Sequence, residues 1–270
     1  MHGDRSPSPS APPTVLAIFA HPDDESLMCG GTLARLADAG VRVVLMCGSR
    51  GERGSISDPE LVAGSDLGTV RVRELHEAAQ VLGVTEVVAL DHRDGDLRWN
   101  DVPEFHAEIV DAIARLRPDA VITFAENGLY WHLDHIGVHE RTLTAVQSFG
   151  AAAPPLYFVT MPRGIIRNVV EAAHAKGDAP ADSSFWGLEP DAFGETEMPV
   201  CLAVDVRPWI ARKLAALRCH RTQMGTRNPI AWIGEDEARR LLGVEYFVRA
   251  PLESAAESML EQLGEPVTSQ

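Results

Sequence analysis

The sequence predicts an α/β fold in which a mostly parallel, Rossmann-like sheet is flanked by helices. Short apolar runs, typical of buried strands, alternate along the chain with longer stretches whose apolar residues recur at helical spacing. Such alternation favours right-handed strand-helix-strand crossovers and therefore a parallel sheet. Polar clusters rich in histidine and aspartate directly follow two of the apolar runs. Open α/β sheets place their sites at the carboxyl ends of strands, so the same pattern indicates where function lies.

The length and composition bound the domain organisation. We expect Met1–Pro13, which is rich in serine and proline, to be a disordered tail, and residues 14–270 to form a single domain with a large core. The tail has too little apolar content for the hydrophobic region of a signal peptide, and no later apolar run is long enough to span a bilayer. The sequence therefore predicts a soluble, cytoplasmic protein.

Charge and cysteine usage exclude several classes of partner. The formal net charge of −15 disfavours nucleic acids and anionic membranes, because both would be repelled. The four cysteines form no C-x-x-C pair and lie within or beside apolar segments, which indicates reduced thiols and disfavours a zinc-thiolate site. We expect a small-molecule substrate, and the sequence leaves a homo-oligomer open.

The first predicted strand, Val15–Phe19, ends in the cluster Ala-His-Pro-Asp-Asp-Glu at residues 20–25. One imidazole and two adjacent carboxylates can divide the work of a metal hydrolase: His21 and one aspartate bind a cation, and the other aspartate handles a proton. Neighbouring side chains in an extended segment point in opposite directions, so Asp23 and Asp24 are expected to differ in role. The alternative is a helix cap, which explains the acidic residues but leaves His21 without a task.

The following elements continue the alternation. We predict a strand at 41–47 that ends in a glycine-rich loop, a helix at 67–82, a strand at 86–90 that runs into the polar segment 91–97, and a helix at 105–116.

A second polar cluster, Gly128–His139, follows the predicted strand Ala120–Phe124 and leads into a helix that extends to Ser148. Its histidines and aspartate stand at the end of a second strand, where they could converge with the first cluster. Either cluster alone could be a helix cap or contain a core histidine. Two such clusters at equivalent strand ends favour a metal site.

The last third of the chain is less regular. We predict strands at 156–160, 200–206 and 244–248, a helix at 208–220, a helix beginning near 235 and a frayed acidic tail. The long loop Gly177–Thr196 is typical of a lid or binding surface. Its aromatic residues Trp186 and Phe193 are expected to contact the part of a substrate that lies away from the reacting group, unless they belong to the core.

Taken together, Ala-His-Pro-Asp-Asp-Glu near the amino end and His-x-Asp-His in mid-chain resemble the LmbE-like (PIG-L) family of zinc-dependent N-acetylglucosaminyl deacetylases, and the similarity runs from about Thr14 to about Met224. The family includes the mycothiol-pathway deacetylase, diacetylchitobiose deacetylases and deacetylases of glycopeptide antibiotic biosynthesis. The resemblance implies hydrolysis of an N-acyl amide, above all an N-acetyl amide, on an aminosugar. Simple N-acetylglucosamine conjugates, thiol-sugar conjugates and glycopeptide intermediates all fit as substrates.

The resemblance also implies a set of metal ligands. By position in the family motif, His21, Asp24 and His135 hold one Zn²⁺ per chain and leave coordination positions open, as catalytic zinc requires. Asp23 takes the proton from the attacking water.

Further roles come from the second motif. His132, as an imidazolium, stabilises the oxyanion or protonates the leaving amine, and Asp134 orients His132. Tyr130 either donates to the oxyanion or forms an aromatic wall of the pocket.

Two more residues match family positions that contact sugar hydroxyls. These are Arg71, in a Gly-x-x-Arg-x-x-Glu segment, and Asp94, in an Asp-Gly step after a strand. An ordinary helix-surface arginine and a turn aspartate are the alternatives. In the family a Gly-Glu-x-Gly segment borders the metal, so Glu52 is a candidate for supporting the metal ligands or contacting the substrate, with an exposed loop carboxylate as the alternative. No family role attaches to His92, although it stands where a ligand or proton carrier could stand.

One alternative function keeps the fold and the metal but does no chemistry, namely a catalytically inactive sugar- or metabolite-binding protein. The intact ligand set and the separate proton carriers favour the enzyme. A nucleotide-binding Rossmann enzyme is disfavoured because the first loop lacks G-x-G-x-x-G.

Overall fold

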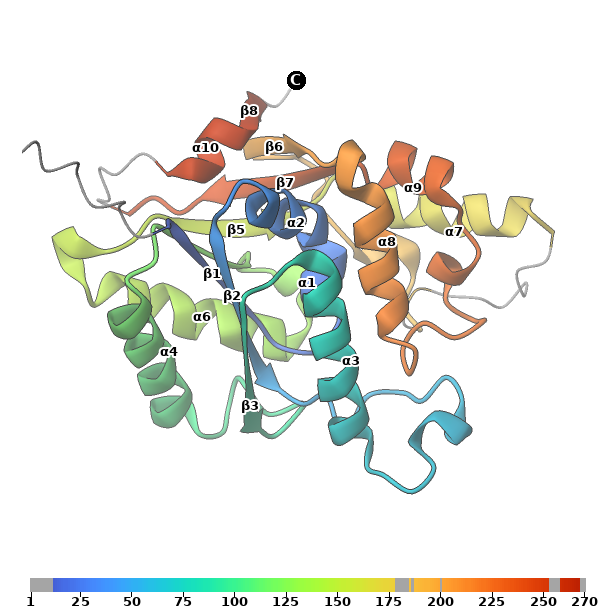
Figure 1. The fold of residues 1–270 in the computed structure, drawn as a ribbon, viewed down its shortest axis with the longest axis horizontal. Helices are drawn as coiled ribbons and strands as arrows, with labels where there is room; N and C mark the ends of the chain where they lie inside the picture. The colour runs from blue at the N-terminus through green and yellow to red at the C-terminus, as the bar shows by residue number, and fades with distance from the viewer. Residues whose placement is uncertain (1–11, 178–184, 186, 200, 253–257, 268–270) are drawn as a thin grey trace, which may run out of the picture.

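The computed structural model describes residues 12–177, 185, 187–199, 201–252 and 258–267. Within these residues eight strands form one sheet in the order β3-β2-β1-β4-β5-β7-β6-β8 (Figure 1). The first five strands pair in parallel, as predicted, and the last three are antiparallel. Their bounds are β1 Thr14–Phe19, β2 Arg42–Ser49, β3 Glu86–His92, β4 Ala120–Phe124, β5 Leu156–Thr160, β6 Cys201–Asp205, β7 Val244–Arg249 and β8 Gly264–Val267.

Helices cover both faces of the sheet. On one face α2 (Gly30–Asp38), α3 (Leu67–Leu82) and α8 (Ile210–Cys219) contact one another, and on the other α4 (Val102–Leu116) packs against α6 (Leu133–Gln147) (Figure 1). The apolar stripe that predicted α4 is its buried face. The α/β class expected from the sequence is therefore the observed one.

The order of the strands creates a switch point beside β1. The chain runs outward from β1 to β2 and β3, then returns to place β4 on the other side of β1. The loops after β1 and β4 consequently diverge at adjoining strand ends, where doubly wound sheets form their crevice. β1 is buried along its whole length, because it lies in the middle of the sheet between two layers of helices.

Four elements differ from the prediction. Helix α7 (Ile165–Ala175) lies where the sequence pattern loosens, β8 and α10 (Met259–Leu263) occupy the region expected to be a frayed tail, and α4 begins at Val102. β8 forms by pairing with β6, a contact between distant segments that local sequence does not encode. Most of the tail predicted at 1–13 lies outside the described residues.

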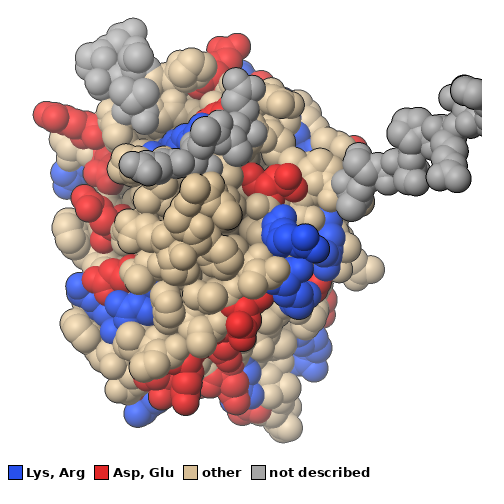
Figure 2. All heavy atoms as spheres, turned by 90° about the vertical axis from the view of Figure 1, so that its left-hand side faces the viewer, with Lys and Arg blue, Asp and Glu red and all other residues tan. Residues whose placement is uncertain are grey.

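The surface carries the charge that the composition implies. Figure 2 shows one face on which basic and acidic side chains lie in small mixed groups over the apolar and neutral background. All four cysteines are free thiols. Among the described residues, none of the helices has the length and apolar character that crossing a membrane requires.

Candidate active site

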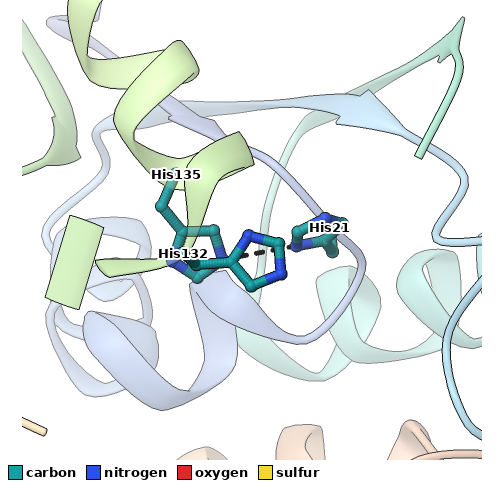
Figure 3. Close-up of side chains that lie close together, drawn as sticks. All are labelled: His21, His132 and His135. Carbon is teal, nitrogen blue, oxygen red and sulfur yellow. Dashed lines mark hydrogen bonds between the residues drawn. The ribbon is translucent and has the colours of Figure 1, made fainter. Parts of the chain in front are cut away.

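The two polar clusters meet at the switch point. His21 follows β1, while His132 and His135 flank the first turn of α6, just after the short helix α5 (Gly128–Trp131) that follows β4. Figure 3 shows the three imidazole rings turned toward one another. Their centroids lie 4.6–5.3 Å apart. The sequence prediction that both motifs share one site is thus reflected in their position.

The side chains of His21, Asp24 and His135 come together, and the two oxygens of Asp24 face different rings. His21 Nδ1 lies 3.4 Å from Asp24 Oδ2, His135 Nε2 lies 3.3 Å from Asp24 Oδ1, and the two nitrogens are 3.3 Å apart. Ligands about 2.0–2.1 Å from a tetrahedral zinc ion stand roughly 3.3–3.4 Å from one another. His135 Nδ1 lies 3.0 Å from the carbonyl oxygen of Gly128, to which its N–H donates, so Nε2 presents a lone pair to this point. The residues present therefore fit the metal.

The other nitrogen of His21 is held by two carboxylates. Nε2 lies 3.1 Å from Asp134 Oδ2 and 3.1 Å from Asp94 Oδ1, so its N–H donates there, and Nδ1 faces Asp24 and His135. Carboxylate partners of this kind fix the orientation of a metal-binding histidine. Two trios have ligand atoms that all lie within 4.8 Å of one another, namely His21 with His132 and His135, and His21 with Asp94 and Asp134. In the second trio His21 uses the nitrogen that donates, which favours the set described above.

This arrangement corrects the role expected for Asp134. Its carboxylate accepts from His21 and from the backbone N–H groups of Gly95 and Leu97, at 2.6 and 3.0 Å, and it does not contact the ring of His132. The physical reason is helical geometry: Asp134 lies in the first turn of α6 and points toward the β3 loop, whereas His132 is the N-cap of that helix. Asp134 therefore orients His21.

His132 carries its proton on Nε2. Its Nδ1 accepts from the backbone N–H of Asp134 at 3.2 Å, which leaves Nε2 as the donor. Burial, together with the neighbouring His135 and His21, lowers the pKa of His132 to about 4. In this environment the ring is neutral near pH 7, which differs from the imidazolium that the family resemblance implied. A neutral ring still offers the Nε2–H as a hydrogen-bond donor.

Asp23 stands beside the ligand set in an unusual backbone conformation. Its φ of 120° and ψ of −26° lie in a region that residues with a side chain rarely adopt, a strain of about 1–3 kcal/mol. Burial raises the pKa of Asp23 to about 7, while the nearby Arg71 opposes that rise. A carboxylate with a pKa near neutrality is suited to act as a general base.

Arg71 is committed to protein groups. The buried guanidinium donates to Asp23 Oδ2 at 3.0 Å and to the carbonyl oxygens of Pro22 at 2.6 Å and Gly51 at 2.9 Å. Arg71 also lines the pocket, and its Nε has no partner among the described residues, so the contact with sugar hydroxyls stays a prediction. The structure adds the contact with Asp23. Neither the helix stripe nor the motif could show this, because the direction of the side chain depends on the loop at 50–54.

Asp94 occupies a similar position between protein and pocket. Besides His21, its carboxylate accepts from the backbone N–H of Arg53 at 2.8 Å. Although burial opposes ionisation, the hydrogen bond from His21 holds the pKa of Asp94 well below its usual range. Glu52 Oε1 accepts from the Asp94 N–H at 2.8 Å, so Glu52 supports this loop. His92 lies elsewhere and pairs with Glu108 at 2.5 Å.

Tyr130 and the long loop form one wall. The Tyr130 ring lies 5.6 Å from that of His132 and 4.7 Å from that of Phe193. Burial, with Asp24 and Asp23 nearby, raises the pKa of Tyr130 well above its ordinary value, so its hydroxyl keeps its proton. Phe193 is fully buried, which corrects the expectation that it meets the substrate, and Trp186 lies outside the described residues.

A strained turn positions His135. Gly128 has a φ of 55°, and a Cβ atom there would stand 2.8 Å from the His135 Cβ. Replacing Gly128 by alanine should push His135 out of line, because the turn supplies the carbonyl that orients its ring. We expect zinc affinity to fall about 10–100-fold, the usual cost of losing an orienting contact. Competition titration with a chelator measures this; Gly150→Ala, also at φ 55° but in open space, is the control.

The site opens into a pocket of about 340 Å³, a size suited to a small molecule. Sequence analysis assigned no role to five residues that line it: Arg53, Gly54, Ser55, Leu188 and Gln223. The Gly-Glu-Arg-Gly run at 51–54 was a usable signal for Arg53, since its glycines mark a loop at a strand end. No sequence motif indicated that Leu188 would line the pocket.

Comparisons with known proteins identify the family. The PIG-L family, described as GlcNAc-PI de-N-acetylase, matches residues 16–146. A 1D-myo-inositol 2-acetamido-2-deoxy-alpha-D-glucopyranoside deacetylase from Acidothermus cellulolyticus is 34% identical over 256 residues, which cover 87% of this chain and 88% of the relative.

Solved structures share the fold. The conserved protein TT1542 from Thermus thermophilus has a TM-score of 0.60 at 25% identity, over 90% of this chain and 96% of that one. The N,N'-diacetylchitobiose deacetylase from Pyrococcus horikoshii has a TM-score of 0.56 at 23% identity, over 88% of this chain and 84% of that one, a likeness of fold. With the motifs, the site and a relative matched over nearly its whole length, the chain belongs to the PIG-L (LmbE-like) family of N-deacetylases.

Proposed function

We propose that the protein hydrolyses the N-acetyl amide of an aminosugar conjugate and that its activity depends on one zinc ion held by His21, Asp24 and His135. The observation that carries the proposal is the convergence of these three side chains, with Asp23 beside them. His135 Nε2 lies 3.3 Å from His21 Nδ1 and from Asp24 Oδ1, and Asp24 Oδ2 lies 3.4 Å from His21 Nδ1. When bound, the ion supplies a Lewis acid that polarises the amide carbonyl and acidifies water.

The chain's own residues would handle the protons. Asp23 accepts a proton as water adds to the carbonyl carbon, and Arg71 holds the carboxylate in place through its 3.0 Å contact. The C–N bond then breaks, and the proton returns to the departing amine. Acetic acid, as acetate, and the free amine are the products.

Two donors face the developing negative charge. His132 offers Nε2–H as a neutral ring, and Tyr130 offers a hydroxyl whose proton is retained. Donors that are fixed before the reaction stabilise an oxyanion without reorganising, which is typically the largest single contribution to catalysis. Asp94 and Asp134 accept from His21 Nε2–H and so fix the orientation of the His21 ring.

For the substrate we propose a glucosaminide of myo-inositol, 1D-myo-inositol 2-acetamido-2-deoxy-alpha-D-glucopyranoside. The support is the relative named for this substrate, which matches 87% of the chain. The polar lining contributed by Arg53, Ser55 and Gln223 suits a polyhydroxyl group beyond the reacting sugar.

A substrate panel tests both levels of the proposal. The zinc-loaded protein is incubated with the inositol conjugate, bare N-acetylglucosamine and diacetylchitobiose, and the new primary amine is quantified. We expect kcat/KM to be highest for the inositol conjugate, because binding energy from the inositol helps to position the amide. Arg53→Ala should reduce the ratio of kcat/KM for the inositol conjugate to kcat/KM for bare N-acetylglucosamine. Equal kcat/KM for all three compounds would contradict the substrate, and no amine from any would contradict the activity.

The alternative of a non-catalytic binding protein predicts a different result. Such a protein would bind the conjugate without releasing amine, which calorimetry and the amine assay together distinguish. The pKa of Asp23, raised to about 7 beside the ligand set, favours the enzyme, because binding alone needs no proton acceptor there.

A further inference from the structure

Glu25 follows the proposed ligand Asp24 but belongs to a separate set of contacts. Its Oε2 accepts from the backbone N–H of Asp23 at 3.1 Å. Its Oε1 accepts from Ser26 Oγ at 2.5 Å and lies 2.9 Å from His220 Nε2, which donates to it. The side chain is fully buried and does not line the pocket. Glu25 therefore acts on its surroundings through the Asp23 backbone on one side and His220 on the other.

His220 reaches this point from the end of α8, 195 residues away along the chain. Its side chain is also fully buried, and Nδ1 has no hydrogen-bond partner among the described residues. The ring is thus held through Nε2, chiefly by Glu25. Burying an ion pair costs desolvation energy that apolar residues of similar size avoid, so packing alone does not account for it.

The pair of Glu25 and His220 contacts Asp23, the residue of the site with the strained backbone. Asp23 has a φ of 120°, and a residue with a side chain keeps such a conformation only when its surroundings enforce it. Arg71 holds the carboxylate of Asp23 from the pocket side at 3.0 Å, and Glu25 holds the backbone N–H from the interior. These two contacts fix the direction in which the carboxylate points.

We propose that Glu25 and His220 are positioning residues for the reaction: they hold the backbone of Asp23 so that its carboxylate faces the attacking water. The inference rests on the proposed role of Asp23 as proton acceptor. His220 contributes by keeping Glu25 in place. Its Nε2–H holds Glu25 Oε1, which leaves Glu25 Oε2 to accept from the Asp23 N–H. Neither residue touches the substrate.

The test is a double-mutant cycle on the zinc-loaded, full-length protein. His220→Met removes the donor at similar volume, His220→Gln restores a donor, and Asp23→Asn keeps the shape but cannot accept a proton. We expect His220→Met to lower kcat about 10–100-fold, the scale of a misplaced catalytic group, with KM and zinc content unchanged. His220→Gln should recover much of this loss. In the Asp23→Asn background, adding His220→Met should lower kcat by less than about twofold. The effects of residues that act as a unit do not add, so the second substitution has little left to remove.

A matched control comes from the same helix. Lys213 on α8 forms another buried ion pair, with Glu245 at 2.6 Å, and Glu245 accepts from the backbone N–H groups of Gly31 and Thr32 rather than from Asp23. Lys213→Met should lower the melting temperature while leaving kcat near that of the parent. This separates loss of a buried pair in general from loss of the pair that contacts Asp23.

Several results would overturn the inference. One is an unchanged kcat in His220→Met. Another is that His220→Met lowers kcat by the same factor in the Asp23→Asn background as in the parent. A third is a zinc content that falls in proportion to kcat. Should His220→Met fail to fold, Glu25→Gln enters the same cycle with the same expectations. If Asp23→Asn itself turned over like the parent, the proposed role of Asp23 would fail instead, so the two failures are distinguishable.

Discussion

Replacing His135 by alanine is expected to remove most of the bound zinc and nearly all turnover. His135 supplies Nε2, which lies 3.3 Å from His21 Nδ1 and 3.3 Å from Asp24 Oδ1. Loss of a contact around a ligand already costs about 10–100-fold in metal affinity, and loss of the ligand itself should exceed that. Elemental analysis after gel filtration gives the zinc content, and the amine assay gives the rate.

His139 provides the control for this experiment. It lies one turn further along α6, is buried, and donates Nδ1–H to a backbone carbonyl, that of Phe124, at 2.9 Å. His139→Ala therefore removes a comparable ring from the same helix without touching the site. We expect it to retain one zinc per chain. Full zinc content in His135→Ala would show that the ligand set is wrong.

Asp23→Asn and His132→Asn are expected to retain zinc but to lose roughly 10²–10⁴-fold in kcat, the range of general acid–base groups. Asp23→Asn keeps an oxygen that can accept from Arg71. His132→Asn keeps an N-cap for α6, because an asparagine side chain can accept from the Asp134 N–H as His132 Nδ1 does. Both changes thus remove the chemistry with little effect on structure.

The readouts separate the two residues from the metal ligands. Zinc content is measured beside kcat for each variant, with His135→Ala as the reference for metal loss. A variant that turns over like the parent would remove that residue from the proton path. A variant that loses zinc together with activity would place the residue among the ligands instead.

The sequence predicted the fold well wherever periodicity was local. The apolar runs at β1 and β4 and the stripe of α4 were sufficient, because buried strands and amphipathic helices carry their own pattern. Helix α7 was missed although Ile166, Val169, Val170 and Ala173 form its buried face, since Pro162 and Gly164 obscure its start. β8 was missed because its pairing with β6 is a tertiary contact.

For the site, the motifs predicted which residues gather but not which atoms meet. His21, Asp24 and His135 lie together as the motifs suggested. The Asp134 carboxylate was assigned to His132 but contacts His21. Arg71 lines the pocket, and the motif did not show that it also contacts Asp23. Sequence spacing places a residue on a turn or a helix face. The partner of its side chain depends on loops from other strands, such as the one that carries Asp94 and Gly95.

The convergence of His21, Asp24 and His135 also bears on how the chain unfolds. His21 and His135 are 114 residues apart in sequence, so an ion bound to both closes a large loop that the unfolded chain would leave open. A ligand that binds only the native state raises the free energy of unfolding, by about 4 kcal/mol when its free concentration is a thousand times Kd. If the proposed site binds zinc, metal-depleted and metal-loaded protein therefore differ in their free energy of unfolding. A substitution that weakens metal binding will register as a loss of global stability wherever the free zinc concentration is not held fixed.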